Sequence, residues 1–242
     1  MTDSRRDSSL TKIFKSGFFC PLFFLDKNRT VKVMSYTTVY EYASKSFIEK
    51  KSEFIGHICP VKTADEAIEF INKIKLENRK ARHNVYAYVV REGNASRYSD
   101  DGEPQGTGGI PVLDVINKAG LTDVCVVVTR YFGGILLGAS GLVRAYSQAC
   151  SMAVNAARKL VMCECSRISF SCDYTMYGKV SYALPEFKVI TEKEDFADTV
   201  NISVLVKNEF VSPLLKKLTD ISNGQLAINE EKNLMADFAG YE

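Results

Sequence analysis

The fold is decided within residues 97–146, which read Arg97-Tyr-Ser-Asp-Asp-Gly-Glu-Pro-Gln-Gly-Thr-Gly-Gly109, then Val126-Val-Val-Thr-Arg-Tyr-Phe-Gly-Gly134, then Leu137-Gly-Ala-Ser-Gly-Leu-Val-Arg144. Nine of the 15 glycines of the chain lie in this region. Glycine loses the most entropy on folding, so it gathers where the backbone turns through positive φ or approaches another group closely. Charged side chains lie among these glycines, and we therefore expect the ligand-binding or nucleic-acid-binding surface here. Its candidate residues are Asp100, Asp101, Glu103, Arg130, Gly133, Gly134 and Arg144.

Length and composition bound the class of protein. With 242 residues, 46% of them hydrophobic, the chain can bury a core and form two modest domains. A formal net charge of +2 excludes a strongly basic nucleic-acid coat protein but allows a local basic face. No apolar run approaches the roughly 20 residues of a membrane-spanning helix, so we expect no membrane partner. The seven cysteines are irregularly spaced, which favours reduced, buried thiols and a cytoplasmic location.

Composition also divides the chain. Residues 1–33 are basic and irregular, whereas a more regular pattern begins at Met34. We hypothesise that residues 1–33 are a dispensable extension, which a start codon assigned too far upstream would explain. We expect a first domain over residues 34–160 and a second over residues 166–242, with a hinge between them where the composition changes. The sequence does not predict an oligomeric state.

Hydrophobic patterns predict the strands and helices of the first domain. Val124-Cys-Val-Val-Val-Thr129 is a continuous apolar run rich in β-branched residues, which is typical of a central strand covered on both faces. Thr63 and Glu66 have the spacing of a capping box, so a helix should begin there. The other predicted strands span residues 37–42, 52–61 and 85–90, and two further helices span about 111–119 and 141–158.

The second domain is predicted to be ferredoxin-like, because its elements follow the order βαββαβ. We therefore assign the whole chain to the α+β class. The predicted strands span residues 167–174, 188–194, 199–206 and 225–229, and the predicted helices span residues 175–184 and 210–221.

A basic cluster follows the first predicted helix and consists of Lys75, Arg79, Lys80 and Arg82. Cations near a helix C-terminus complement the helix dipole, and this explanation accounts for part of the pattern. The alternative is a patch that binds the phosphates of a nucleic acid. The cluster therefore joins the candidate binding residues.

The acidic residues Asp100, Asp101 and Glu103 have two interpretations. Carboxylates are ligands of hard cations, so the three residues could hold Mg²⁺ for phosphoryl chemistry. Asp-Gly and Glu-Pro pairs are also ordinary turn chemistry, and we favour this second interpretation. We therefore predict no metal site and no cofactor.

Arg130 and Arg144 also have two interpretations. With the backbone N–H groups of residues 138–141 at a helix start, they could bind a phosphate group. The alternative is that one or both arginines pair with the carboxylates of residues 100–103 inside the fold. His83 is expected to be a structural or surface histidine rather than a general base, because no Ser or Cys nucleophile motif lies near it. No catalytic residue is predicted.

Six motifs, which are quoted at the end of this paragraph in chain order, together resemble the signature of the IMPACT (YigZ-like) family. The resemblance covers Met34 to about Lys159, and the second domain resembles the small C-terminal domain of bacterial members. It implies an N-terminal α/β domain like domain IV of elongation factor G and a ferredoxin-like second domain like domain V of that factor. The motifs are Lys51-Ser-Glu-Phe-Ile-Gly56, Arg82-His-Asn-Val-Tyr-Ala87, Ser99-Asp-Asp-Gly-Glu-Pro104, Gly106-Thr107, Val128-Thr-Arg-Tyr-Phe-Gly-Gly134 and Leu137-Gly-Ala-Ser-Gly-Leu-Val-Arg-Ala-Tyr146.

The resemblance also implies a role in translation. Eukaryotic members regulate translation by binding the activator of a kinase that acts on an initiation factor. This chain has 33 unpatterned residues in place of their N-terminal protein-interaction domain, so we do not transfer that role. Two functions remain. We favour a non-enzymatic regulator that binds RNA, the ribosome or translation factors, and the alternative is an enzyme that acts on a phosphorylated or nucleotide ligand at the glycine-rich Asp/Arg face.

Overall fold

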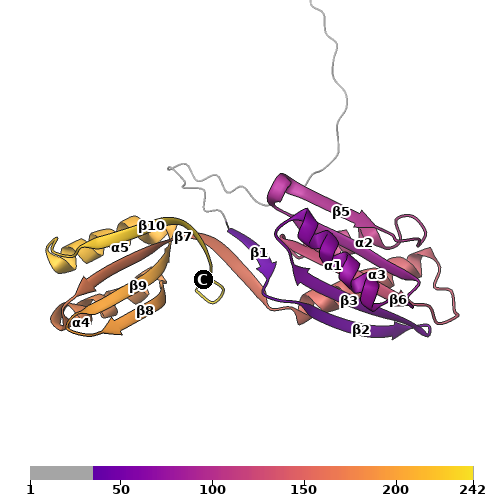
Figure 1. Cartoon of the computed structure of the whole chain (residues 1–242), viewed down its shortest axis with the longest axis horizontal. Helices are drawn as coiled ribbons and strands as arrows, with labels where there is room; N and C mark the ends of the chain where they lie inside the picture. The colour runs from indigo at the N-terminus through magenta and orange to yellow at the C-terminus, as the bar shows by residue number, and fades with distance from the viewer. Residues whose placement is uncertain (1–34, 242) are drawn as a thin grey trace, which may run out of the picture. The chain divides into compact units, whose positions relative to one another are not determined.

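The structure, a computed structural model, describes residues 35–241 (Figure 1). The predictions made for residues 1–33 lie outside this range. Within it the chain forms two antiparallel sheets with helices packed against them, so the α+β class predicted from the sequence is confirmed.

The first sheet has the strand order β2-β3-β6-β4-β5, and all neighbouring strands are antiparallel. β6 is the central strand and is buried from Val124 to Arg130, as its apolar run predicts. β3 and β4 each pair antiparallel with β6, so they run parallel to each other, and α1 joins them as a split βαβ unit with β6 between them. The elements are β2 (Ala43–Glu49), β3 (Ser52–Pro60), α1 (Ala64–Glu77), β4 (His83–Val90), η1 (Glu92–Asn94), β5 (Ala95–Ser99), α2 (Gly109–Lys118), β6 (Val124–Tyr131) and α3 (Ala139–Ala156).

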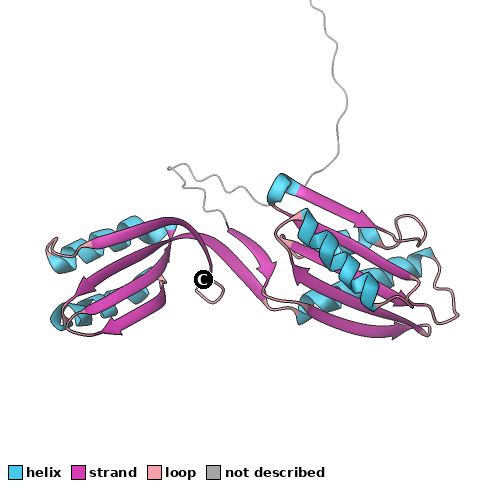
Figure 2. Ribbon diagram, viewed as in Figure 1, coloured by secondary structure: helices cyan, strands magenta, loops and turns pink. Residues whose placement is uncertain are grey.

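Helices cover both faces of this sheet (Figure 2). α1 begins at the predicted capping box, where the Glu66 N–H donates to the Thr63 hydroxyl at 3.1 Å. Successive residues of β6 point to opposite faces, so Cys125 and Val127 pack under α1 while Val126 and Val128 belong to the core beneath α2 and α3. β6 is therefore held between two apolar layers, and the position of its last residues is well fixed.

The elements that follow α3 have the predicted order βαββαβ, and their strands form the second sheet together with β1. The strand order is β10-β7-β9-β8, all antiparallel, with β1 paired to the first part of β7. α4 and α5 pack on one face through an apolar cluster that includes Val180, Leu214 and Val204. The elements are β1 (Ser35–Val39), β7 (Lys159–Cys172), α4 (Tyr174–Ala183), η2 (Leu184–Phe187), β8 (Ile190–Phe196), β9 (Val200–Lys207), α5 (Asn208–Ser222) and β10 (Ile228–Asp237).

β7 runs through the segment where the sequence predicts a hinge. It begins at Lys159 rather than at Arg167, and its residues 159–163 pair with β1. The domain limits 34–160 and 166–242 stay predictions, but both cuts would fall inside this strand. Within residues 35–241, no helix is both long and apolar enough to cross a bilayer.

Candidate functional site

One edge of the first sheet gathers the end of β6 and the starts of its two neighbours. Arg130 on β6 lies opposite Phe54 on β3 and opposite His83 on β4. The hydroxyl of Tyr131 donates to the side-chain oxygen of Asn78, the C-cap residue of α1, at 2.9 Å. The end of α1, the β2–β3 turn and the start of β4 therefore all lie at this edge.

Arg130 and Glu103 form a buried ion pair here. Their side chains are 6% and 4% exposed, and Arg130 Nη1 lies 2.6 Å from Glu103 Oε1. The hydroxyl of Tyr146, on α3, donates to the same oxygen at 2.8 Å. Burial, followed by the nearby Glu103 carboxylate, raises the pKa of Tyr146, which keeps its hydroxyl protonated as a donor. Of the two interpretations of Arg130, the structure thus shows the internal pair, and its partner is Glu103.

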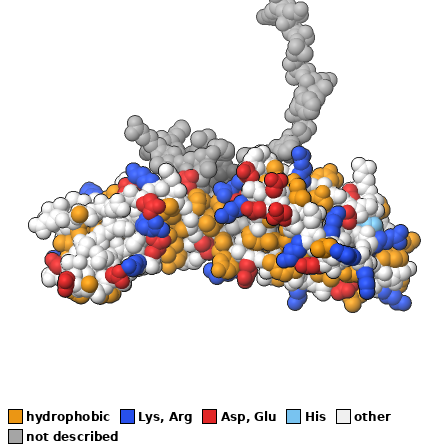
Figure 3. All heavy atoms as spheres, viewed as in Figure 1, with side chains coloured by type: hydrophobic (Ala, Val, Ile, Leu, Met, Phe, Trp, Pro, Cys, Tyr) orange, Lys and Arg blue, Asp and Glu red, His pale blue; other side chains and the backbone are white. Residues whose placement is uncertain are grey.

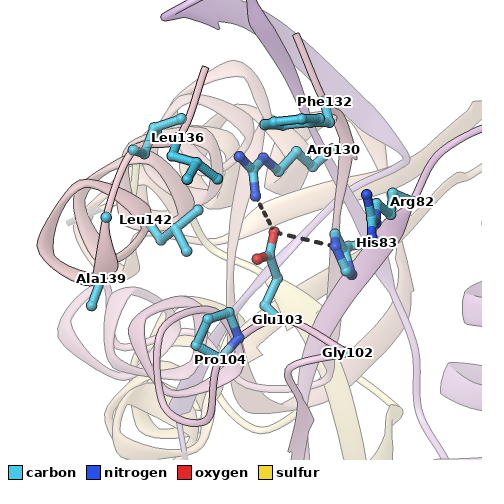
Figure 4. Close-up of a pocket in the computed structure, with 12 residues that line it drawn as sticks. Arg82, His83, Gly102, Glu103, Pro104, Arg130, Phe132, Leu136, Ala139 and Leu142 are labelled. Atoms are coloured by element: carbon cyan, nitrogen blue, oxygen red, sulfur yellow. Dashed lines mark hydrogen bonds and ion pairs between the residues drawn. The ribbon is translucent and has the colours of Figure 1, made fainter. Parts of the chain in front are cut away.

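The Arg130 guanidinium lies between two aromatic rings. Its central carbon is 5.4 Å from the ring centroids of both Phe54 and Phe132. Figure 4 shows the guanidinium with Phe132 on one side and Glu103 on the other. Its Nε atom is buried and has no hydrogen-bond partner within residues 35–241. The pair with Glu103 therefore leaves part of the guanidinium unused.

His83 lies on the same side of the site as Glu103. Its Nδ1 is 2.8 Å from the backbone oxygen of Asp101, and because a carbonyl only accepts, Nδ1 carries the proton. In the neutral ring Nε2 is then an acceptor, and it lies 3.9 Å from Glu103 Oε1. His83 is thus a positioned histidine, and both it and Tyr146 belong to the site although neither was among the candidate binding residues.

These side chains line a pocket of about 390 Å³ (Figure 4). Glu103, Arg130, His83 and Arg82 supply its polar groups, and the start of α3 forms the wall across from His83. The rest of the lining is mainly apolar: Gly102, Pro104, Phe132, Leu136, Leu137, Gly138, Ala139 and Leu142. Few convergent polar groups in an apolar cavity are the usual composition of a small-molecule site.

Asp100 holds the glycine-rich loop together. Its carboxylate accepts backbone N–H bonds from Gly106, Gly108 and Gly109 at 2.8–3.0 Å. Burial raises the pKa of this carboxyl, but the three N–H bonds outweigh burial and lower the pKa below its ordinary value. Asp100 therefore organises the loop and the start of α2.

Asp101 anchors the loop to β4. Its carboxylate accepts the N–H of Asn84 at 2.7 Å and binds the Lys75 ammonium at 2.6 Å. Lys75, one of the predicted phosphate-binding cations, thus has a carboxylate partner inside the domain. The three acidic residues do not converge, and no group of three metal-ligating side chains occurs anywhere in the described range 35–241.

The two adjacent glycines after β6 differ in what surrounds them. A Cβ on Gly133 would lie 1.9 Å from the backbone oxygen of Lys51, so this glycine permits the loop after β6 to pack on the β2–β3 turn. Gly134 has φ of +87° and open space around it. Of the two candidate binding glycines, Gly133 is a packing residue and Gly134 is free of neighbours.

Arg79, Lys80 and Arg82 are exposed in the segment between α1 and β4. Two further exposed cations, Lys50 and Lys51, form the β2–β3 turn, and Arg144 lines an adjacent hollow with Lys50 and Glu49. None of these six cations forms an ion pair within residues 35–241. In Figure 3, Lys and Arg side chains gather over the part of the first domain where Figure 1 places α1. We call Lys50, Lys51, Arg79, Lys80, Arg82 and Arg144 the basic rim.

The loop that follows β6 exposes apolar side chains beside the basic rim. Phe132 is 40% exposed, Ile135 41% and Leu136 81%. Arg130 and Arg144, which the sequence groups at one phosphate, lie in separate hollows that share Leu137 as a wall. The sequence had no signal for Lys50 and Lys51, because only the hairpin brings them to this edge.

Comparison with known proteins assigns both domains. The Impact N-terminal domain matches residues 50–154, and a domain of unknown function, DUF1949, matches residues 170–225. The IMPACT family member YvyE of Bacillus subtilis is 39% identical over 201 residues, which cover 81% of this chain and 91% of that protein. The chain belongs to the IMPACT family. It has the two-domain arrangement of the bacterial type.

Other members of the IMPACT family share less of the chain. YigZ of Escherichia coli is 30% identical over 182 residues, covering 74% of this chain and 89% of that protein. Protein IMPACT of Xenopus laevis is 33% identical over 124 residues, which cover 46% of this chain and 39% of that protein. A crystal structure described as that of an hypothetical protein has a TM-score of 0.52 and 28% identity, covering 80% of this chain and 96% of that chain.

Proposed function

We propose that this IMPACT family member is a non-enzymatic regulator that binds RNA in the translation machinery through the basic rim. The observation that carries the proposal is the set of six exposed cations without ion pairs, placed around exposed Phe132 and Leu136 at one sheet edge. Lys62, Arg97 and Lys118 are exposed elsewhere in the first domain and also form no ion pair within residues 35–241. What distinguishes the rim is the grouping of its cations beside exposed apolar side chains, and such a group favours a partner that brings its own negative charge.

The side chains of the basic rim suit single-stranded RNA. Lys and Arg bind phosphates and release counterions, while exposed aromatic rings stack on unpaired bases. Glu49 and Glu77 are exposed carboxylates at the same edge, and they reduce the net positive charge without removing it. RNA with accessible bases therefore fits this surface better than a smooth duplex.

The fold gives further support. The βαββαβ order and the strand order β10-β7-β9-β8 of the second domain are those of a ferredoxin-like domain. The resemblance described above relates the two domains to domains IV and V of elongation factor G. A regulator that contacts the ribosome, or factors bound to it, is consistent with that relation.

A second candidate function is an enzyme that acts on a phosphorylated ligand in the pocket. The observation that favours it is the position of His83, which lines the pocket with its Nε2 3.9 Å from Glu103 Oε1. His83→Gln would abolish such an activity while leaving RNA binding unchanged. We place this candidate second because no nucleophile accompanies the histidine in the pocket lining.

The proposal is tested by the salt dependence of RNA binding. The variant Arg79→Gln/Lys80→Gln/Arg82→Gln should bind a short single-stranded RNA more weakly than the unmodified protein. Each lost phosphate contact lowers the slope of log K against log salt by about 0.7, so three contacts lower it by about 2. Fluorescence anisotropy at several salt concentrations measures both affinity and slope.

Two control variants keep the test specific. Lys62→Gln/Arg97→Gln/Lys118→Gln removes the same charge from exposed residues outside the rim, and it should leave the slope unchanged. Lys75→Gln removes a cation already held by Asp101, and we expect no effect on RNA affinity. Equal slopes for the rim variant and the first control would contradict the proposal.

A further inference from the structure

The pocket is lined by an arginine whose hydrogen-bonding groups are only partly paired. Arg130 is buried to more than nine tenths and lines the pocket, yet its Nε has no partner within residues 35–241. Arg130 Nη1 and the Tyr146 hydroxyl both donate to Glu103 Oε1. Glu103 therefore binds the Arg130 guanidinium only at its Nη1 end. Figure 4 shows the guanidinium projecting from β6 between Phe132 and Glu103 toward the wall formed by Leu136 and Leu142.

The start of α3 supplies a second set of donors. Its N-cap, Gly138, makes no capping bond, and the first turn contains no acidic residue. The first N–H groups of a helix have no partners within the helix, and the helix dipole favours an anion beside them. Gly138 and Ala139 line the same pocket as Arg130. Arg130 and the start of α3 therefore line one cavity.

The charge and the lining of the pocket restrict the kind of ligand that it can bind. Arg130 compensates the Glu103 carboxylate, so Arg82 at the pocket and the α3 N-terminus leave the cavity positive in balance. A phosphate monoester has three terminal oxygens, enough to accept bonds from Arg130 and from α3 together. Phe132, Leu136 and Leu142 form a wall suited to a planar ring.

We propose that this pocket binds a phosphate monoester attached to a planar base, which is the chemistry of a nucleoside 5′-monophosphate. The phosphate contacts Arg130 and the first turn of α3, and the base lies against Phe132 and Leu136. A free nucleotide and the 5′-phosphorylated end of an RNA strand both present this group. For the strand end, the inference rests on the proposed RNA binding, since the basic rim would hold the nucleotides that follow.

The test compares ligands that differ only in the phosphate. Adenosine 5′-monophosphate should bind while adenosine should not, by isothermal titration calorimetry. An RNA with a 5′-phosphate should bind at least about tenfold more tightly than the same RNA with a 5′-hydroxyl, which corresponds to one charge-assisted contact.

A charge at the start of α3 locates the site without disturbing the core. Ala139 is exposed, and Ala139→Asp stabilises a helix N-terminus while it repels a phosphate. We expect Ala139→Asp to remove the advantage of the 5′-phosphate and the binding of adenosine 5′-monophosphate. Ala139→Asn, of nearly the same size and without charge, should keep both. Equal binding by the two variants would overturn the inference.

The outcomes separate this inference from the proposed function. RNA that binds equally with and without its 5′-phosphate, with no binding of the nucleotide, overturns the pocket and leaves the rim. Binding of the nucleotide alone, without RNA, supports the pocket and contradicts the proposed function. Binding of neither ligand overturns both.

Discussion

Near the start of β6, Asp123 accepts the N–H of Arg91 at 2.8 Å and the Nε of Arg91 at 2.7 Å. The same guanidinium lies 3.5 Å over the ring of Tyr36. Near the end of β6, Glu103 binds Nη1 of Arg130 at 2.6 Å, but the Nε of Arg130 has no partner within residues 35–241. The two arginines therefore differ in how fully the fold uses them.

The Arg91–Asp123 and Arg130–Glu103 pairs also differ in how exposed the arginine is and in whether it lines a pocket. Arg91 is largely exposed at 45% and lines none of the pockets described above, whereas Arg130 is buried and lines the largest of them. Around Arg130 lie the six unpaired cations of the basic rim. We infer that Arg91, which is bound on several sides, serves the fold alone, whereas Arg130, which lines the pocket, serves both the fold and the proposed ligand. The predictions below test this distinction.

The largest effect is expected for Arg130→Gln. It leaves the Glu103 carboxylate buried without its cation, which costs about 3–5 kcal/mol of the free energy of unfolding. Arg91→Gln should cost less than Arg130→Gln, because the Arg91 side chain is 45% exposed and the buried Asp123 carboxylate keeps the N–H of residue 91. The urea midpoints of the two variants measure the difference.

A double variant separates charge from packing at Arg130. Arg130→Met/Glu103→Gln removes both charges, so it should recover much of the stability lost by Arg130→Gln. It should still lose binding of the nucleotide, since the donors are gone. If Arg91→Gln lowered the midpoint as much as Arg130→Gln, the comparison of the two ends would fail.

A smaller effect is expected for Gly133→Ala. Its Cβ would meet the backbone oxygen of Lys51 at 1.9 Å, so the loop after β6 or the β2–β3 turn must shift, at about 1–3 kcal/mol. The matched change Gly134→Ala meets no neighbour and carries only the strain of positive φ, about 1 kcal/mol. Thermal melts rank the two variants, and an equal loss would show that the contact at Lys51 does not constrain the turn.

The smallest effect is expected for Asp100→Asn, and it depends on pH. The folded pKa of Asp100 is depressed, so its stabilising contribution is present above the unfolded pKa of about 3.9 and is lost as the pH falls through the folded pKa. Asp100→Asn should therefore cost about 1 kcal/mol at pH 7, reduced by partial exposure, and progressively less below pH 4. Urea midpoints from pH 7 down to pH 3 test this, and a cost that stays constant over the range would contradict the role of the charge.

Strong apolar patterns are sufficient to predict much of this fold. The buried run of β6 and the capping box of α1 both appear where expected, because burial on two faces and a cap leave clear signals. β2 is not predicted, since it is an edge strand in which only Ala43 and Phe47 are half-buried. β5 is mostly exposed as well. Without β2 the β2–β3 hairpin is not predicted.

The sequence predicts where the candidate site lies but not which of its side chains pair with one another. From the sequence, any of the three neighbouring carboxylates could pair with Arg130. In the folded loop Asp100 accepts backbone N–H bonds, and Glu103 is the residue that pairs with the arginine. His83 is held by a backbone oxygen, which no side-chain motif reveals. Lys50 and Lys51 reach the site through a turn between strands, one of which has no sequence signal.

The pairing of β1 with β7 has a consequence for synthesis. β1 comes before the first sheet in the chain, but β7, the strand with which it pairs along its length, is made only after that sheet is complete. Until the start of β7 has left the ribosome, the hydrogen-bonding partners of the nascent β1 within residues 35–241 are limited to the contacts of Thr37 and Thr38 with residues 121–123. Contacts between such distant segments slow folding and leave partly folded chains open to aggregation. The order of synthesis thus places the pairing of β1 with β7 after synthesis of the first sheet and before synthesis of β8, β9 and β10.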